Sequence, residues 1–205
     1  MKTNARTYES PLREEQVEQT RERILEATAR VLAANDGTLS IPAVAREAAV
    51  SVPTVYRHFG TKEDLITSLG EHFFDKFRLA DRRPPADLDE LRAFLIEQAA
   101  EYAKAEPTLQ ALATTEAGRK ARQELLPRRK QVIAEGLGPL LDGISDEDQR
   151  RVRDVYLLLT SSGGYRAGRE LLAYSDEQLA DMIVWVVERL ARGSQGAKRT
   201  RKEMR

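Results

Sequence analysis

The sequence contains no cysteine and only two histidines, His58 and His72. The lack of cysteine excludes disulfide bonds and thiol catalysis and is typical of a cytoplasmic protein. Neither histidine follows a glutamate by three residues, so the Glu-x-x-His signature of helical di-iron enzymes is absent. The glycines do not form a Walker or Rossmann phosphate-binding loop. We therefore expect no metal, no cofactor and no enzymatic activity.

Long apolar runs and an excess of one charge are also missing. No window approaches the roughly 18 apolar residues of a membrane-spanning helix, and the polar start MKTNARTYES is unlike a signal peptide. The 33 basic and 33 acidic residues cancel, which argues against a protein that coats DNA simply by positive charge. With 205 residues, 41% of them hydrophobic, the chain can form one well-buried domain or two small ones.

Two short amphipathic helices are predicted between residues 40 and 60. Ser40 and Ser51 are suitable N-caps, and Pro42 and Pro53 are tolerated in the first turns. The joint at 49–51 leaves room only for a sharp turn, as in a DNA-binding helix-turn-helix. In each segment apolar residues recur at i, i+3, i+4 and i+7: Ile41, Val44, Ala45 and Ala48, then Val52, Val55, Tyr56 and Phe59.

The second of these helices has the side chains of a recognition helix. Val52 and Pro53 can contact a thymine methyl group, and Arg57 can donate two hydrogen bonds to guanine. Gly60 and a cap at Thr61 predict that a third helix follows, with a phosphate-binding lysine in its first turn. The alternative is an ordinary solvated helix face. The predicted DNA contacts are Ser40, Arg46, Ser51, Val52, Pro53, Thr54, Tyr56, Arg57, His58 and Lys62.

The segments TRERILEATARVLAANDG and AVSVPTVYRHFGTKEDLI together resemble the DNA-binding domain of the TetR family of bacterial transcriptional regulators, over about residues 20–70. With the helical patterns elsewhere, the resemblance implies an all-α fold. An N-terminal three-helix bundle with the helix-turn-helix would precede a C-terminal antiparallel helical domain for ligand binding and dimerisation. The family usually has glycine where this chain has Ala49, and alanine there would cost roughly 1 kcal/mol in a left-handed turn. Either the turn is remodelled or packing absorbs the strain.

The predicted domain order is a flexible arm at 1–16, the DNA-binding domain at 17–60, an effector-binding and dimerisation domain at 61–192, and a flexible basic tail at 193–205. The first helix should begin near Val17 and close at 35–37, and the helix after Thr61 should stop at 82–85. Pro107 is expected to end a helix that begins at Asp87, and Pro127 to start another. The basic cluster 128–130 is interpreted as a solvated helix face rather than as an anion site.

The last two helices suggest a dimer. The apolar residues Val152, Val155 and 156–159 cover all sides of one helix, and Trp185 lies among charged residues of the final helix. A second copy should therefore cover both helices in a four-helix bundle. The small residues 161–164 permit either close helix approach or a local helix break. The predicted interface residues are Tyr156, Leu158, Ser162, Gly163, Ile183, Trp185 and Val187.

A ligand pocket is predicted where Gln98 interrupts an apolar stripe, because a buried amide needs a partner or a cavity. Its residues are Phe73, Phe77, Phe94, Gln98, Tyr102, Leu112 and Tyr165, although the first two are common core residues. The resemblance then implies a dimeric repressor that a small, mostly apolar ligand releases from a palindromic operator. An activator, an effector-independent architectural DNA-binding protein and, with least support, a helical enzyme are the alternatives.

Overall fold

The computed structural model describes residues 11–35, 37–76 and 85–203, and this part of the chain is helical with no β-strand. The all-α prediction is therefore confirmed. The elements are α1 (Pro11–Ala34), α2 (Ile41–Glu47), α3 (Val52–Phe59), α4 (Lys62–Lys76), α5 (Leu88–Thr114), α6 (Glu116–Leu137), a 3-10 turn (Pro139–Leu141), α7 (Asp146–Leu159), α8 (Ser162–Leu172) and α9 (Asp176–Glu203). None of the described helices is long and apolar enough to cross a membrane.

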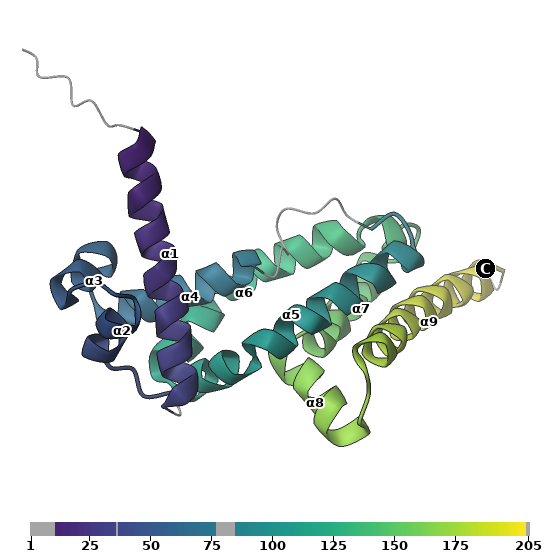
Figure 1. Cartoon of the computed structure of the whole chain (residues 1–205). Helices are drawn as coiled ribbons and strands as arrows, with labels where there is room; N and C mark the ends of the chain where they lie inside the picture. Colours follow the sequence, from purple (N-terminus) through teal and green to yellow (C-terminus); the bar gives the residue numbers. More distant parts are fainter. Residues whose placement is uncertain (1–10, 36, 77–84, 204–205) are drawn as a thin grey trace, which may run out of the picture.

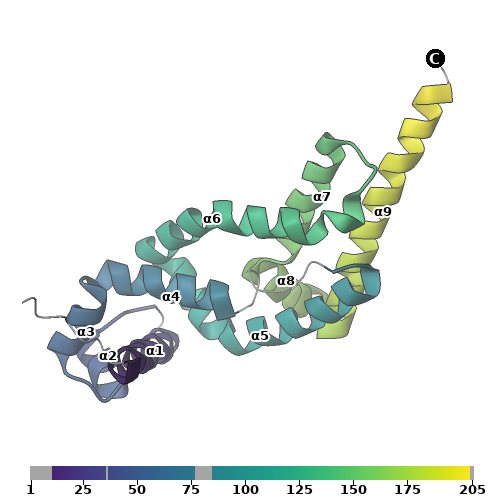
Figure 2. The same cartoon turned by 90° about the horizontal axis from the view of Figure 1, so that it is seen from above.

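Helices α1 to α3 lie at one end of the molecule and α9 lies at the opposite end in both views (Figure 1, Figure 2). Helix α4 leaves the first group and runs beside α6, with which it makes extensive contact. A continuous apolar core joins the two regions, and Ile24, Val44, Leu65 and Leu95 are fully or almost fully buried in it. The DNA-binding candidate is thus attached to the rest of the chain through α1 and α4.

Helix α1 begins earlier than predicted. It starts at Pro11, a residue that suits the first turn of a helix, so residues 11–16 are helical and do not belong to a flexible arm. Val17 is half exposed, and the buried face of α1 starts at Ile24. The helix closes before Gly37, which has a positive φ of 84°. Residues 1–10, which hold the rest of the predicted arm, and Asp36 lie outside the described part of the chain.

The two predicted proline breaks are wrong. Pro107 lies inside α5 and Pro127 lies inside α6. A proline within a helix costs about 3 kcal/mol through one lost hydrogen bond and a steric clash, and the long packed faces of α5 and α6 outweigh this cost. Directly after Pro107, the buried Thr108 donates to the Ala29 carbonyl at 3.2 Å and fixes α5 against α1. The predicted stop of α4 at 82–85 falls largely outside the described residues.

The chain breaks locally between α7 and α8. Ser161 caps α8 by accepting a hydrogen bond from the Gly164 N–H at 2.9 Å. A Cβ at Gly164 would lie 2.3 Å from the Leu159 carbonyl oxygen, so this position requires glycine. The small residues therefore make the helix break, which was one of the two alternatives. The last helix, α9, continues to Glu203 and so includes most of the segment that was predicted to be a tail.

Candidate DNA-binding surface and ligand cavity

The turn between α2 and α3 is held by its backbone and its caps. Ser40 accepts from the Ala43 N–H at 3.4 Å, and Ser51 accepts from the Thr54 N–H at 3.2 Å. Ala49 has a φ of 53°, the left-handed conformation that glycine would adopt without strain. The Val50 N–H closes α2 on the Ala45 carbonyl at 2.9 Å. The turn is therefore formed in the ordinary way, with alanine under backbone strain.

The packing of α3 leaves its polar side outward. Val55 and Phe59 are buried against the core, whereas Pro53, Tyr56 and Arg57 are exposed. These three are among the predicted base-reading and phosphate-contacting side chains. Ser40, Arg46, Ser51 and Lys62 are exposed as well, and Val52, Thr54 and His58 are partly buried. All ten predicted residues thus keep some exposed surface.

Helix α4 begins directly after α3. Gly60 has a φ of 73° and ends α3. Thr61 and Asp64 then form the predicted cap, since the Asp64 N–H donates to the Thr61 Oγ1 at 3.0 Å and the Thr61 N–H donates to the Asp64 carboxylate at 3.2 Å. Lys62 is exposed and is the first residue of α4, so it follows the last residue of α3 closely in the sequence.

Arg21 on α1 is a functional candidate that the sequence patterns did not indicate. Its guanidinium group lies 4.6 Å from the Phe59 ring centre and donates to the His58 carbonyl at 3.4 Å and to the Ser68 hydroxyl at 3.1 Å. One side chain therefore connects α1, α3 and α4. Partial burial and the positive charges of Arg57 and Arg21 lower the pKa of His58, so its imidazole is neutral near pH 7.

A cavity of about 420 Å³ lies between α4, α5, α6 and the junction of α7 and α8. Its volume is in the range of small-molecule sites. Most of the lining is apolar, and two arginines and the hydroxyl groups of one tyrosine and two serines are the polar groups. The lining residues are Ile66, Gly70, Phe73, Phe74, Tyr102, Leu109, Leu112, Ala113, Gly118, Ala121, Arg122, Leu125, Leu126, Arg129, Leu157, Leu158, Ser161 and Ser162.

The predicted pocket residues fall into three groups. Phe73, Tyr102 and Leu112 line the cavity. Phe94, Gln98 and Tyr165 do not line it, and Phe77 lies outside the described residues. The helical periodicity correctly placed the second group on inward faces, but it did not show which inward residues face a void and which are covered by a neighbouring helix.

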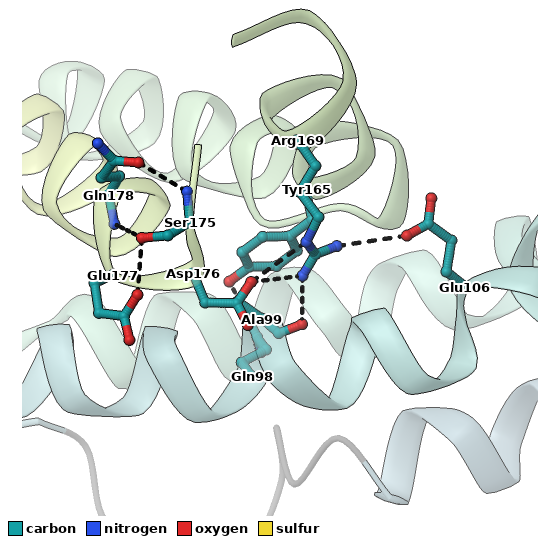
Figure 3. A network of polar contacts seen from close by, with 9 residues as sticks. All are labelled: Gln98, Ala99, Glu106, Tyr165, Arg169, Ser175, Asp176, Glu177 and Gln178. Carbon is teal, nitrogen blue, oxygen red and sulfur yellow. Dashed lines mark hydrogen bonds and ion pairs between the residues drawn. The ribbon is translucent and has the colours of Figure 1, made fainter. Parts of the chain in front are cut away.

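Gln98 and Tyr165 belong to a polar network between α5, α8 and the start of α9 (Figure 3). The Tyr165 hydroxyl donates to the Gln98 Oε1 at 2.9 Å, and the Tyr165 ring packs on Tyr102 with 5.1 Å between ring centres. Burial strongly raises the pKa of Tyr165, so its hydroxyl stays a donor at neutral pH. Arg169 on α8 donates to the Ala99 carbonyl on α5 at 2.6 Å and pairs with Asp176 of α9 at 2.9 Å. The network fixes α8 and the start of α9 to α5.

Some of the predicted dimer-interface residues do not lie on the surface of the subunit. Tyr156, Ile183 and Val187 are 5%, 1% and 2% exposed, so they belong to the core of the subunit and a second copy could not reach them. An apolar stripe looks the same in sequence whether its own chain or another covers it. Leu158 and Trp185 are 69% and 57% exposed, Gly163 is exposed and Ser162 is partly exposed.

Residues 24–69 match the sequence model of the bacterial regulatory proteins of the tetR family. No curated protein sequence is significantly similar to the chain. Among solved structures, a transcriptional regulator from Rhodococcus sp. Rha1 is 21% identical with a TM-score of 0.64, over 85% of this chain and 97% of that chain. A TetR-family transcriptional regulator from Streptomyces coelicolor is 23% identical with a TM-score of 0.51, over 85% of this chain and 99% of that chain.

These likenesses show the fold, and the matched regions include almost the whole length of both solved structures. The resemblance of the segment around the helix-turn-helix is confirmed by the family match, which includes α2, α3 and the first half of α4. Residues 24–69 are therefore similar in sequence to the bacterial regulatory proteins of the tetR family, and the fold of the whole chain is similar to that of solved transcriptional regulators.

Proposed function

We propose that the protein is a dimeric transcriptional repressor that binds a palindromic operator and leaves it when a small, mostly apolar ligand enters the C-terminal cavity. Regulators of this family are in general non-enzymatic DNA-binding proteins. The observation that carries the proposal is the position of α4, which begins at Lys62 beside the recognition helix and lines the cavity through Ile66, Phe73 and Phe74. One rigid element thus borders both candidate sites.

The contacts around α4 support a mechanical link. Gly70 lies where α4 meets α6, and a Cβ there would approach the Ala121 Cβ to 3.4 Å. A ligand that widens the cavity would press on α4 at this close contact. The Arg21 hydrogen bond to Ser68 and the Arg21 contacts with Phe59 and His58 then connect a shift of α4 to α3. Such coupling needs only about 1 to 3 kcal/mol.

Dimerisation is supported by apolar side chains that are exposed at the end of the molecule opposite the helix-turn-helix. Trp185 and Leu190 on α9 are 57% and 40% exposed, and Leu171 and Leu172 at the end of α8 are 79% and 51% exposed. Large apolar side chains exposed on neighbouring helices are typical of a surface that another protein covers. A two-fold dimer through this end would present two recognition helices to half-sites about one helical turn, or a multiple of it, apart.

The decisive experiment is selection of bound sequences from random duplex DNA, followed by titration of the selected duplex at several salt concentrations. A palindromic site bound about 1,000-fold or more tightly than random DNA would support a dimeric, sequence-specific regulator. Uniform binding that falls steeply with salt and shows no preferred sequence would refute it and favour an architectural DNA-binding protein. The selected duplex then serves to measure release by candidate ligands.

A further inference from the structure

We propose that the cavity binds a ligand with a carboxylate on an apolar body, and that Arg122 and Arg129 hold the carboxylate. The regulatory meaning of this site rests on the proposed function, but its chemistry follows from the cavity itself. The sequence pattern favoured a solvated helix face for residues 128–130. The structure separates these three side chains: Lys130 is exposed, Arg128 lies over the Phe74 ring, and the Nε of Arg129 is buried.

Neither arginine of the cavity forms an ion pair with a carboxylate of the described residues. Arg122 donates to the Ser162 hydroxyl at 3.3 Å, and Arg129 donates to the Thr160 carbonyl at 2.6 Å. The buried Nε of Arg129 has no acceptor. Several other arginines do pair with acids: Arg92 with Asp181, Arg128 with Asp75, Arg151 with Glu147, Arg169 with Asp176, and Arg192 with Glu188.

The two guanidinium groups converge on one place. Arg122 and Arg129 are two turns apart on the same face of α6, about 10 Å along its axis. Their hydrogen bonds reach Ser162 and Thr160, which lie on either side of the junction between α7 and α8. Tyr102 lines the cavity beside them, and its interaction with Arg129 opposes the rise in its pKa that burial causes. The polar end of the cavity is therefore at this junction.

The charge and shape of the lining select the ligand class. No aspartate or glutamate is among the described lining residues, so the two positive charges at the cavity are not neutralised from within it. A hydrogen-bonding cation such as the partly buried Arg129 favours an anion, and arginine matches the planar geometry of a carboxylate. The remaining lining is apolar and extends to Phe73 and Phe74 on α4. At roughly 30 Å³ for each water-sized group, the cavity holds about 14 non-hydrogen atoms.

Decanoate, decan-1-ol and decyltrimethylammonium share an apolar chain and differ in the charge of the head group, so they test the proposal by isothermal titration calorimetry on the full chain. Decanoate is expected to bind about tenfold more tightly than the alcohol, and the cation should bind most weakly. Arg122→Met and Arg129→Met should each weaken decanoate about tenfold and change the alcohol less than about twofold.

Arg119→Met is the matched control, because Arg119 lies one turn before Arg122 on α6, carries the same charge and does not line the cavity. It should leave decanoate binding unchanged. If Arg129→Met fails to fold after losing its bond to Thr160, the exposed Arg122 still provides the test. Equal binding of the acid and the alcohol, or an equal loss in the control and the cavity variants, would overturn the proposal.

Release of the selected operator duplex is measured separately, so that the two proposals can fail independently. Decanoate that binds with the predicted dependence on Arg122 but leaves the operator complex intact would support the carboxylate site and refute ligand-driven release. Release by decan-1-ol at the same concentration as by decanoate would support release and overturn the preference for a carboxylate.

Discussion

Replacing Ala49 with glycine should stabilise the protein. Ala49 is exposed and has a φ of 53°, so its side chain makes no buried contact that the substitution would remove. A Cβ in the left-handed conformation costs about 1 to 2 kcal/mol. Glycine relieves this strain, but it also raises the backbone entropy of the unfolded chain, which lowers the free energy of unfolding by about 0.5 to 1 kcal/mol. The expected net gain is about 0.5 to 1 kcal/mol, or roughly 2 °C in Tm.

Urea unfolding followed by far-ultraviolet circular dichroism measures this difference, with the protein concentration held fixed because dimerisation would contribute to stability. The chain supplies its own controls. Ala173 is also exposed with a φ of 53°, so Ala173→Gly should give a gain of the same sign. Ala48 is buried with a φ of −82°, so Ala48→Gly should destabilise by about 1 kcal/mol or more.

The outcome that would refute the reasoning is a loss of stability in Ala49→Gly similar to that in Ala48→Gly. It would mean that residue 49 does not occupy the left-handed region and that the turn between α2 and α3 has another form. The operator affinity of Ala49→Gly should stay within about twofold of the parent, because glycine can follow the same backbone path and keeps the orientation of α3.

Three further predictions concern DNA reading, helix packing and pH. Arg57→Ala should weaken operator binding and blur base preference, whereas Lys62→Ala should weaken binding about equally on all sequences, both measured by titration of selected and random duplexes. Gly168→Ala should lower the free energy of unfolding by about 1 to 3 kcal/mol in urea titrations, because the new Cβ would lie 2.1 Å from the Cδ2 of the buried Leu179. Burial, followed by the charge of Lys76, lowers the pKa of His72, so folding favours its neutral form. Stability should therefore be full above the ordinary histidine pKa and fall as the pH decreases through that value toward the lowered pKa of the folded state, with a smaller decrease in His72→Gln.

Each of these predictions has a contradicting result. Equal losses on every sequence for both DNA-binding variants would remove Arg57 from base reading. Gly163→Ala is the control for Gly168, because its Cβ would meet nothing closer than 3.7 Å at an exposed position of α8, and equal losses in both would show that the contact with Leu179 is not the cause. The same pH dependence in His72→Gln and the parent would exclude His72 as the titrating group.

The helix-turn-helix could be predicted from sequence because its determinants are local. The caps at Ser40, Ser51 and Thr61 act within one helical turn, and the period of buried residues in α2 and α3 is set by the helix itself. The prolines show where local rules stop. At Pro107 and Pro127 the local preference to end the helix is real, but packing of the long helices decides the outcome, and no window of sequence contains that packing.

Some residues of the cavity lining could be predicted because helical periodicity is also a local property of the sequence. Phe73, Tyr102 and Leu112 are inward-facing residues of helices that do border it, so helical periodicity was sufficient to propose them. Arg122 and Arg129 could not be found this way, because a charged residue on a helix is solvated in most proteins. Only the placement of α6 against the junction of α7 and α8 shows that both side chains line the cavity.

The strength of the contacts around α4 fits a helix that a ligand can shift. Its ion pair between Asp75 and Arg128 is exposed and contributes at most about 1 kcal/mol, and the hydrogen bond from Arg21 to Ser68 contributes about 1 kcal/mol. The coupling needed for release is about 1 to 3 kcal/mol. In the proposed release, loss of one or two such contacts would be enough to shift Lys62 and α3, while the buried Leu65 and Leu69 would keep α4 in the core. A helix fixed by a buried salt bridge would resist the same ligand, because breaking such a pair costs about 3 to 5 kcal/mol.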